Sequence, residues 1–275
     1  GEDVGSALAR HRDVKLTALT GSVETGVKIM GMASQNLSRV VLELGGKNPH
    51  IVFRDADVVR AAAAVMNGIF TNAGQMCWAG SRLLVDEGVK EAVLRKLVEG
   101  ANGMRLGDGL KPETAMGPLV AESQRKKVAG YVETGIGEGA RVAAGGALPT
   151  EEGLEGGYFY RPTILDGVTQ DMKVAREEIF GPVLTVTAFS GDDDAVLKAN
   201  DSEFGLWAGV WTNDLRRAHR VAGLLEAGIV TVNEEPITFP QTPFGGFKNS
   251  GNSSEQGMEA VLTYVRTKNV SVNLD

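Results

Sequence analysis

Short apolar runs alternate with longer amphipathic stretches along nearly the whole chain. This alternation predicts an α/β fold with a mostly parallel sheet, because buried strands read as apolar runs and the helices between them as amphipathic segments. The expected strands are residues 15–19, 39–42, 50–53, 82–85, 183–189, 208–212 and 229–232. The expected helices are residues 21–33, 57–72, 90–101, 123–135, 192–199 and 214–226, with Asp55, Asp57, Ser123 and Asn213 where N-caps belong.

Two segments interrupt this alternation. Residues 144–160 are rich in glycine and proline, which predicts an excursion over the surface. Residues 264–274 hold β-branched residues in partial alternation, which predicts a terminal strand with an exposed edge. We expect that strand to pair with another subunit.

Composition excludes several classes of protein. The net charge of -7, with no basic cluster longer than residues 125–127, argues against a nucleic-acid partner. One cysteine rules out an intrachain disulfide and fits a reducing compartment, and no run reaches the roughly 18 apolar residues of a membrane span. We therefore expect a cytoplasmic protein without membrane contact. The chain opens on Gly1 in what reads as the end of a helix, so we expect residues upstream.

The single cysteine, Cys77, is flanked by glycines, and Glu43 precedes the pair Gly45-Gly46. A thiol beside glycines can be approached closely by a ligand, and a carboxylate beside a glycine pair can swing, so the two fit a nucleophile and a base. The alternatives are structural. A lone cysteine is commonly a small buried hydrophobe, and Glu43 can equally accept backbone hydrogen bonds at the end of its strand.

Three further segments allow a functional or a structural interpretation. Gly21 and Ser22 follow a strand and open a helix, a place that suits a phosphate or simply connects two elements. Residues 177–182 combine carboxylates with a phenylalanine and a Gly-Pro turn, which fits a ribose site or a helix end. The phenylalanines in residues 243–248 fit a pocket mouth or a core. The three histidines have no metal-ligand spacing, so no metal site is expected.

Taken in order, five segments resemble the aldehyde dehydrogenase superfamily. They are LTGS at 19–22, LELGGKNP at 42–49, NAGQMC at 72–77, EEIFGP at 177–182 and PFGGFKNSG at 243–251. The resemblance covers essentially the whole chain. It implies an aldehyde dehydrogenase-like catalytic domain with a mostly parallel sheet, plus a truncated remnant of a Rossmann-type cofactor domain.

The resemblance also implies roles for individual residues. Cys77 matches the nucleophile that attacks the aldehyde, and Glu43 matches the base that assists hydrolysis of the thioester. The other matched positions are Gly21, Ser22, Leu44, Gly45, Glu178 and Phe180 for the cofactor, which is NAD or NADP, and Trp78 and Phe244 for the substrate. The expected partners are a small-molecule aldehyde and, in the intact enzyme, further copies in a homodimer or homotetramer.

The same resemblance divides the chain into three parts. Residues 1–45 match the end of the cofactor domain, 46–249 the catalytic domain, and 250–275 a return to the cofactor domain followed by an oligomerisation strand. The family's asparagine that supplies the second oxyanion donor, and its adenosine-binding segment, would lie upstream of this chain.

Two alternatives to aldehyde oxidation remain open from the sequence. One is a non-catalytic fragment or assembly partner, because the upstream cofactor segments are absent from the sequence. The other is a coenzyme A-acylating enzyme, against which Glu43 argues. The sequence names neither the aldehyde nor the choice between NAD and NADP.

Overall fold

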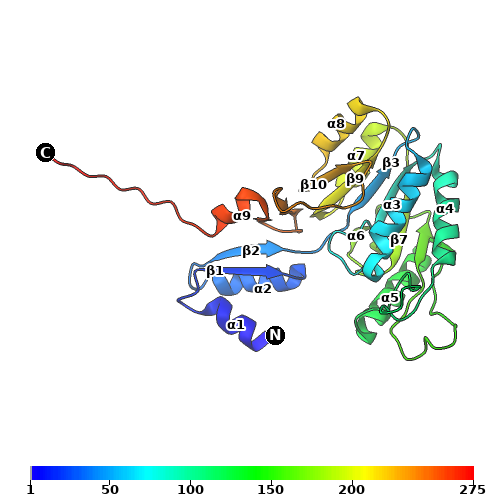
Figure 1. Ribbon diagram of the computed structural model, residues 1–275, viewed down its shortest axis with the longest axis horizontal. Coiled ribbons are helices and arrows are strands. Elements are labelled where there is room, and N and C mark those ends of the chain that lie inside the picture. The colour runs from blue at the N-terminus through cyan, green and yellow to red at the C-terminus, as the bar shows by residue number, and fades with distance from the viewer. Residues whose placement is uncertain (1) are drawn as a thin grey trace.

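The computed structural model describes residues 2–275 and contains a small and a large α/β unit (Figure 1). The small unit comprises α1 (Glu2–Arg10), β1 (Leu16–Thr20), α2 (Val23–Ala33) and β2 (Arg39–Glu43), and β1 pairs with β2 in parallel. The turn after β2 leads directly into β3 (Pro49–Val52), the first strand of the large unit. The mixed α/β architecture with mostly parallel strands confirms the expected fold class.

The large unit is built on a seven-stranded sheet in the order β10-β9-β3-β4-β7-β6-β5. Besides β3, its strands are β4 (Arg82–Asp86), β5 (Arg141–Ala144), β6 (Thr163–Asp166), β7 (Val183–Phe189), β9 (Trp207–Trp211) and β10 (Ile229–Val232). Every pair is parallel except β5 with β6. Antiparallel β5 at one edge and β10 at the other limit the sheet.

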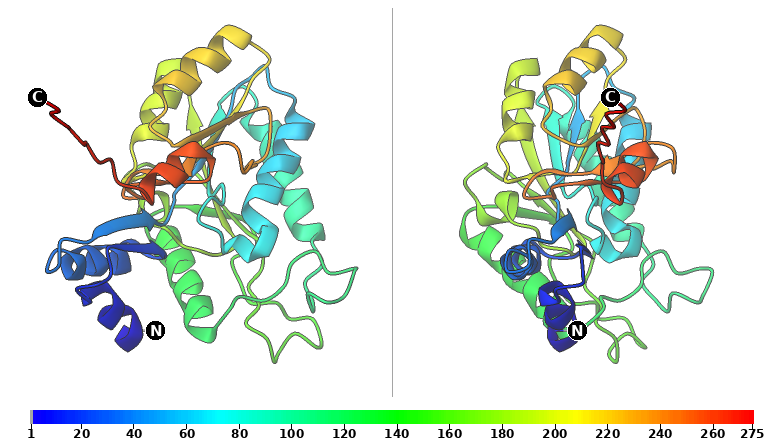
Figure 2. Two further views of the ribbon diagram at one scale, coloured as in Figure 1. Left: turned by 60° about the vertical axis from the view of Figure 1, so that its left-hand side comes forward. Right: turned by 90° about the vertical axis from the view of Figure 1, so that its left-hand side faces the viewer.

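Helices cover both faces of this sheet (Figure 2). On one face, α3 (Val58–Phe70) and α4 (Lys90–Gly103) pack together, and α7 (Asp192–Asn200) and α8 (Leu215–Leu224) lie on the other. Alternation along β4 supplies both cores, since Leu83 and Val85 belong to the cluster under α3 and α4 while Leu84 belongs to the cluster under α7 and α8. Burial on both faces explains why these strands read as continuous apolar runs.

The remaining helices are α5 (Glu122–Gly137), α6 (Lys173–Arg176) and α9 (Gly257–Thr263), with a 3₁₀ turn, η1 (Thr71–Gly74), after α3. Short ladders join β8 (Phe204–Gly205) to β12 (Phe247–Lys248) and β11 (Phe244–Gly245) to β13 (Ser254–Glu255). None of the helices in residues 2–275 is long and apolar enough to cross a bilayer.

The expected elements compare closely with the observed ones. All seven expected strands are confirmed to within one residue at each end, and all six helices to within two. The sequence analysis missed the helices α6 and α9, the four-residue strands β5 and β6, and the two-residue strands β8, β11, β12 and β13. The loop over residues 145–158 lies on the surface as expected, although Phe159 and Tyr160 at its end are buried.

Three of the four expected N-caps, Asp55, Ser123 and Asn213, are wrong. Asp57 caps α3 through the N–H groups of Val59 and Arg60, but α5 starts after Ala121 rather than at Ser123, and Asp214 rather than Asn213 caps α8. Asp55 accepts hydrogen bonds from Thr212 and Asn213 and so ties the loop after β3 to the end of β9.

The expected terminal strand is absent from this single chain. Residues 265–275 form no strand within the described part of the chain and extend away from the body (Figure 1). The physical reason is that a strand needs a hydrogen-bonded neighbour, and none of the elements in residues 2–275 pairs with this segment.

Because the sheet is buried on both faces, a cavity made at its centre should lower the free energy of unfolding. Leu84 has no solvent exposure, so we expect Leu84→Ala to lower the free energy of unfolding by about 2–5 kcal/mol. Leu110, which is 93% exposed, is the matched control, and Leu110→Ala should change it by no more than about 0.5 kcal/mol. Urea unfolding followed by circular dichroism measures both, and equal losses would contradict this assignment of the core.

Candidate active site

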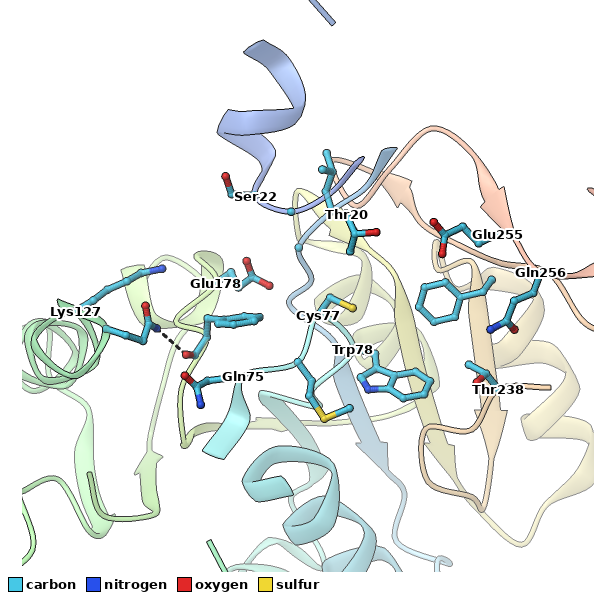
Figure 3. A pocket seen from close by; sticks show the side chains of 17 residues that line it. Thr20, Ser22, Gln75, Cys77, Trp78, Lys127, Glu178, Thr238, Glu255 and Gln256 are labelled. Atoms are coloured by element: carbon cyan, nitrogen blue, oxygen red, sulfur yellow. Dashed lines mark hydrogen bonds between the residues drawn. The ribbon is translucent and has the colours of Figure 1, made fainter. Parts of the chain in front are cut away.

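A cavity of about 750 Å³ separates the small unit from the large one. Its walls come from the carboxyl ends of β1 and β2 on one side, and from the segments just before β4 and β7 on the other. The cavity therefore lies at the amino ends of the large sheet's strands. It is lined by Thr20, Gly21, Ser22, Leu44, Gly45, Gln75, Met76, Cys77, Trp78, Gln124, Lys127, Glu178, Phe180, Thr238, Phe244, Glu255 and Gln256 (Figure 3).

The loop that carries Cys77 has an unusual backbone. Asn72, Ala73 and Gly74 all have positive φ, at 53°, 53° and 71°. Reciprocal hydrogen bonds between Asn72 and Gln75, each side chain donating to the other's carbonyl, hold this left-handed turn together. A methyl group at Gly74 would overlap the carbonyl of Gly181, so only glycine lets the loop approach the segment before β7. The turn ends α3 sharply and brings Cys77 to the cavity wall.

The thiol of Cys77 is half-buried, which raises its pKa, and the charges of Glu178 and Glu43 raise it further. Hydrogen bonding from the backbone N–H groups of Trp78 and Cys77 acts in the opposite direction and lowers the pKa. In Figure 3 the thiol lies between the side of the cavity with Glu178 and Lys127 and the side with Trp78, Thr238 and Gln256. The backbone donors beside Cys77 are suited to stabilise negative charge at that point.

Glu43 is the last residue of β2, and its side chain is only 3% exposed. Neither carboxylate oxygen has a hydrogen-bond partner among the described residues. Burial, and secondarily the charge of Glu255, raises the pKa of Glu43 to about 8. A carboxyl group with such a pKa exchanges its proton near neutral pH, which is the property required of a general base.

Glu178 lies opposite the turn that follows Glu43. Its Oε1 accepts a hydrogen bond of 2.9 Å from the N–H of Gly46, and a methyl group at Gly45 would overlap the carboxylate. Burial raises the pKa of Glu178, while the Gly46 hydrogen bond and the charge of Lys127 counteract it. Beside it, Phe180 has a positive φ of 58°, and its carbonyl accepts a hydrogen bond from Gln124.

The cavity has features that suit a dinucleotide. Ser22 caps α2 by accepting a hydrogen bond from the N–H of Thr25, so the positive end of an eleven-residue helix faces the wall that Gly21 and Ser22 form. Lys127 adds a positive charge nearby, and Glu178 supplies an acceptor for sugar hydroxyls. Between the wall of Gly21 and Ser22 and the carboxylate of Glu178, Leu44 and Gly45 form a surface without bulky polar groups. These residues fit the pyrophosphate, ribose and nicotinamide of NAD(P).

All of the expected site residues but one line this cavity. The exception is Glu43, which is buried immediately behind Leu44. The sequence analysis missed Thr20, Gln75, Met76, Gln124, Lys127, Glu255 and Gln256. Gln124 and Lys127 are three positions apart on α5, a spacing that places two side chains on one helix face, but nothing in the sequence indicates that this face meets a cavity.

The comparison with known families decides the assignment of the chain. The sequence model described as the aldehyde dehydrogenase family matches residues 1–270. The chain belongs to the aldehyde dehydrogenase family. Betaine aldehyde dehydrogenase of Brucella anthropi is 47% identical over 272 residues, and that of Bacillus subtilis is 45% identical over 273 residues. Both alignments cover 99% of the chain.

Solved structures of other proteins also resemble the chain. A betaine aldehyde dehydrogenase of Staphylococcus aureus in complex with NAD+ has a TM-score of 0.93 at 39% identity, covering 95% of this chain and 52% of that one. PnpE from Pseudomonas sp. WBC-3 has a TM-score of 0.93 at 41% identity, covering 94% of this chain and 53% of that one. The chain spans 56% of the length of the two curated relatives.

The buried carboxyl group of Glu43 predicts a pH dependence of stability. Because its folded pKa of about 8 exceeds the ordinary 4.5, the folded state holds the proton more tightly than the unfolded state. Relative to Glu43→Gln, the parent protein should therefore lose stability as the pH rises from 5 to 8, by up to about 1.4 kcal/mol per pH unit.

Thermal or urea unfolding at several pH values measures this difference. The control is Glu152→Gln, at an exposed position in the loop before β6, which should track the parent protein at every pH. A constant gap between the parent and Glu43→Gln would show that Glu43 does not hold its proton in the fold.

Proposed function

We propose that this chain carries the catalytic part of an NAD+-dependent oxidation of an aldehyde to a carboxylic acid. The observation that supports it most is the position of Cys77, on a cavity wall with two backbone N–H donors beside its thiol and acidic groups on the neighbouring turn. Membership of the family and the NAD+ complex of the Staphylococcus aureus relative agree with this function.

In the first step the Cys77 sulfur attacks the aldehyde carbon. A C–S bond forms, the C=O π bond breaks, and the thiol proton passes to a base. The negative charge that develops on oxygen meets the backbone donors at Cys77. The product is a thiohemiacetal on Cys77. The residues between α3 and β4, 71–81, that carry it are called the nucleophile loop.

Bound NAD+ would supply the acceptor for the hydride that leaves the former aldehyde carbon, which would leave a thioester on Cys77. The chain's own residues orient this exchange. Gly21 and Ser22 at the start of α2 bind phosphate, Glu178 accepts hydrogen bonds from ribose hydroxyls, and Phe180 packs against the ring system. Leu44 and Gly45 form the cavity wall between the two sites.

Glu43 assists the last step. Its carboxylate takes a proton from water, the hydroxide adds to the thioester, and the C–S bond breaks to release the acid and restore the thiol. The turn through Gly45 and Gly46 gives this side chain a route toward the cavity. Transfer to coenzyme A needs no such base, so the buried carboxyl group favours hydrolysis.

The three-part division of the chain belongs to the same proposal. Residues 1–45 contribute to the cofactor domain, 46–249 form the catalytic domain, and 250–275 return to the cofactor domain and supply an oligomerisation strand in a homodimer or homotetramer. Backbone pairing of Glu43 with Gly251 and a hydrogen bond from Leu44 to Ser250 support the return.

The natural protein that contains this sequence should reduce NAD+ when given an aldehyde. We expect Cys77→Ser to abolish turnover, and Glu43→Gln to slow it by about 100- to 10,000-fold while leaving a single burst of NADH, because hydride transfer precedes hydrolysis. Absorbance of NADH in stopped flow measures the burst and the steady rate. Full turnover by Cys77→Ser would refute the function, and coenzyme A-dependent turnover of Glu43→Gln would favour acyl transfer.

Trp78 is expected to restrict the size of the aldehyde. Its ring stacks edge-on against Phe244, at 5.8 Å between ring centroids, so the two rings form one wall of the cavity. Trp78→Ala should raise kcat/KM for a bulky aldehyde relative to a small one by about tenfold or more, since each methylene in a pocket contributes about 1–3 kcal/mol. Phe239→Ala, outside the cavity wall, is the control, and an unchanged ratio would remove the hypothesis.

A further inference from the structure

The buried side chain of Asn48 connects the turn through Gly45 and Gly46, here called the glycine turn, to the nucleophile loop. Its Nδ2 donates hydrogen bonds of 2.9 Å to the carbonyls of both Cys77 and Ala79. Its Oδ1 accepts one of 2.9 Å from the N–H of Trp207 at the start of β9. With an exposure of 2%, this amide is fully engaged with backbone groups and with nothing else.

Asn48 acts from behind the cavity wall. It does not line the cavity, and it follows Gly46 by two positions in the turn between β2 and β3. A side chain at Gly46 would overlap the Cys77 carbonyl and crowd the Asn48 amide. The glycine therefore leaves the space in which Asn48 reaches the nucleophile loop.

Because the peptide bond is planar, the hydrogen bond from Asn48 to the Cys77 carbonyl also fixes the direction of the Trp78 N–H. In a trans peptide the C=O and the N–H point in opposite directions. Since Asn48 holds the C=O of Cys77, the N–H of Trp78 in the same peptide plane is directed away from Asn48. That N–H is one of the two backbone donors that lower the pKa of the thiol.

A second anchor prevents the peptide from rotating. The Ala79 carbonyl binds the other Nδ2 hydrogen, the Ala79 N–H donates to Met76, and the Gly80 N–H donates to Gly68 in α3. Two carbonyls held by one rigid amide fix the segment from Cys77 to Ala79 on both sides. Without Asn48 the Cys77 carbonyl and the Trp207 N–H would be buried without partners, and the Ala79 carbonyl would keep only the N–H of Ser81, so the segment would have to rearrange to satisfy them.

We propose that Asn48 is a positioning residue for Cys77, which holds the Cys77–Trp78 peptide so that its N–H supports the thiolate and the developing oxyanion. Its consequence for turnover rests on the proposed function. Its effect on the thiol does not, because alkylation of Cys77 requires neither cofactor nor aldehyde.

The decisive experiment is the pH dependence of Cys77 alkylation by iodoacetamide. Asn48→Leu keeps the shape of the side chain, adds no charge and removes all three hydrogen bonds, so we expect alkylation at pH 7.5 to slow about tenfold, as for a thiol pKa one unit higher. The profile should shift to higher pH with an unchanged plateau. A profile that coincides with the parent protein's would overturn the proposal.

Asn36 provides a matched control. Its Nδ2 also donates to two carbonyls, those of Ala9 and His11, and its Oδ1 accepts from the N–H of Ser38, all within the small unit. Asn36→Leu should lower the thermal midpoint without changing the alkylation profile. Equal shifts in both variants would mean that general loosening of the fold, and not the Asn48 contacts, controls the thiol.

Asn48→Ser covers the case in which Asn48→Leu does not fold, as judged by circular dichroism. A serine hydroxyl retains one donor, so its profile should shift to higher pH than the parent's by less than the one unit expected for Asn48→Leu, and identity with the parent would again overturn the proposal. In the natural protein, Asn48→Ser should lower kcat more than it changes KM. If Asn48→Ser slows alkylation while the dehydrogenase activity of the natural protein stays intact, the positioning role stands and its consequence for turnover fails. If alkylation shifts as expected but the natural protein is inactive as a dehydrogenase, the proposed function fails and the positioning role stands.

Discussion

Close backbone approach at three glycines is the constraint on which the site depends. Gly45 abuts the Glu178 carboxylate, Gly46 abuts the Cys77 carbonyl, and Gly74 abuts the Gly181 carbonyl. Each pair joins segments that are far apart in the sequence. At Gly46 and Gly74 a methyl group would meet a backbone carbonyl and force the segments apart, and at Gly45 it would displace the Glu178 carboxylate. The turn after β2, the loop before β4 and the segment before β7 therefore form one interlocked unit, and the reactive groups share a cavity because these contacts exist.

The same compactness controls the electrostatics. Glu43, Glu178 and Cys77 are all acidic groups in a partly buried space, and burial raises the pKa of each. Each charge also opposes the ionisation of its neighbours, as the effects of both glutamates on the thiol show. At neutral pH Cys77 and most of Glu43 therefore hold their protons. The favourable interactions for a thiolate come from backbone N–H groups, whose directions depend on how the chain is held.

Much of this could be predicted from sequence, for identifiable reasons. Strands buried on both faces, such as β4 and β7, produce apolar runs that are hard to mistake, and the cysteine and glutamate motifs stand out by their glycines. The short β5 and β6 were missed because four residues beside a glycine-rich loop carry little periodicity. Asn48 drew no attention because an asparagine before a proline reads as an ordinary turn residue, and its three partners lie 29, 31 and 159 positions away.

The positions of the site residues in the fold were harder to predict than which residues form the site. The sequence analysis placed Glu43 correctly at the carboxyl end of a strand, but local patterns cannot reveal that this end of the small sheet faces the amino ends of the large one. Such an arrangement arises from the packing of two units, which involves contacts between residues such as Gly45 and Glu178. The same limit applies to Gln124 and Lys127 on α5, which an isolated helix pattern assigns to a solvated face.

The backbone clasp on β2 has a consequence for the order in which the protein is made. Leu42 and Glu43 pair with β1 within the small unit, yet their other partners, at Ser250, Gly251 and Asn252, are made about 210 residues later. At a ribosomal rate of about 5–20 residues per second, these partners are made roughly ten seconds or more after Glu43. Until then the other edge of β2 has no hydrogen-bond partner at Leu42 and Glu43. The end of β2 that carries Glu43 is therefore completed only after residues 250–252 have been made.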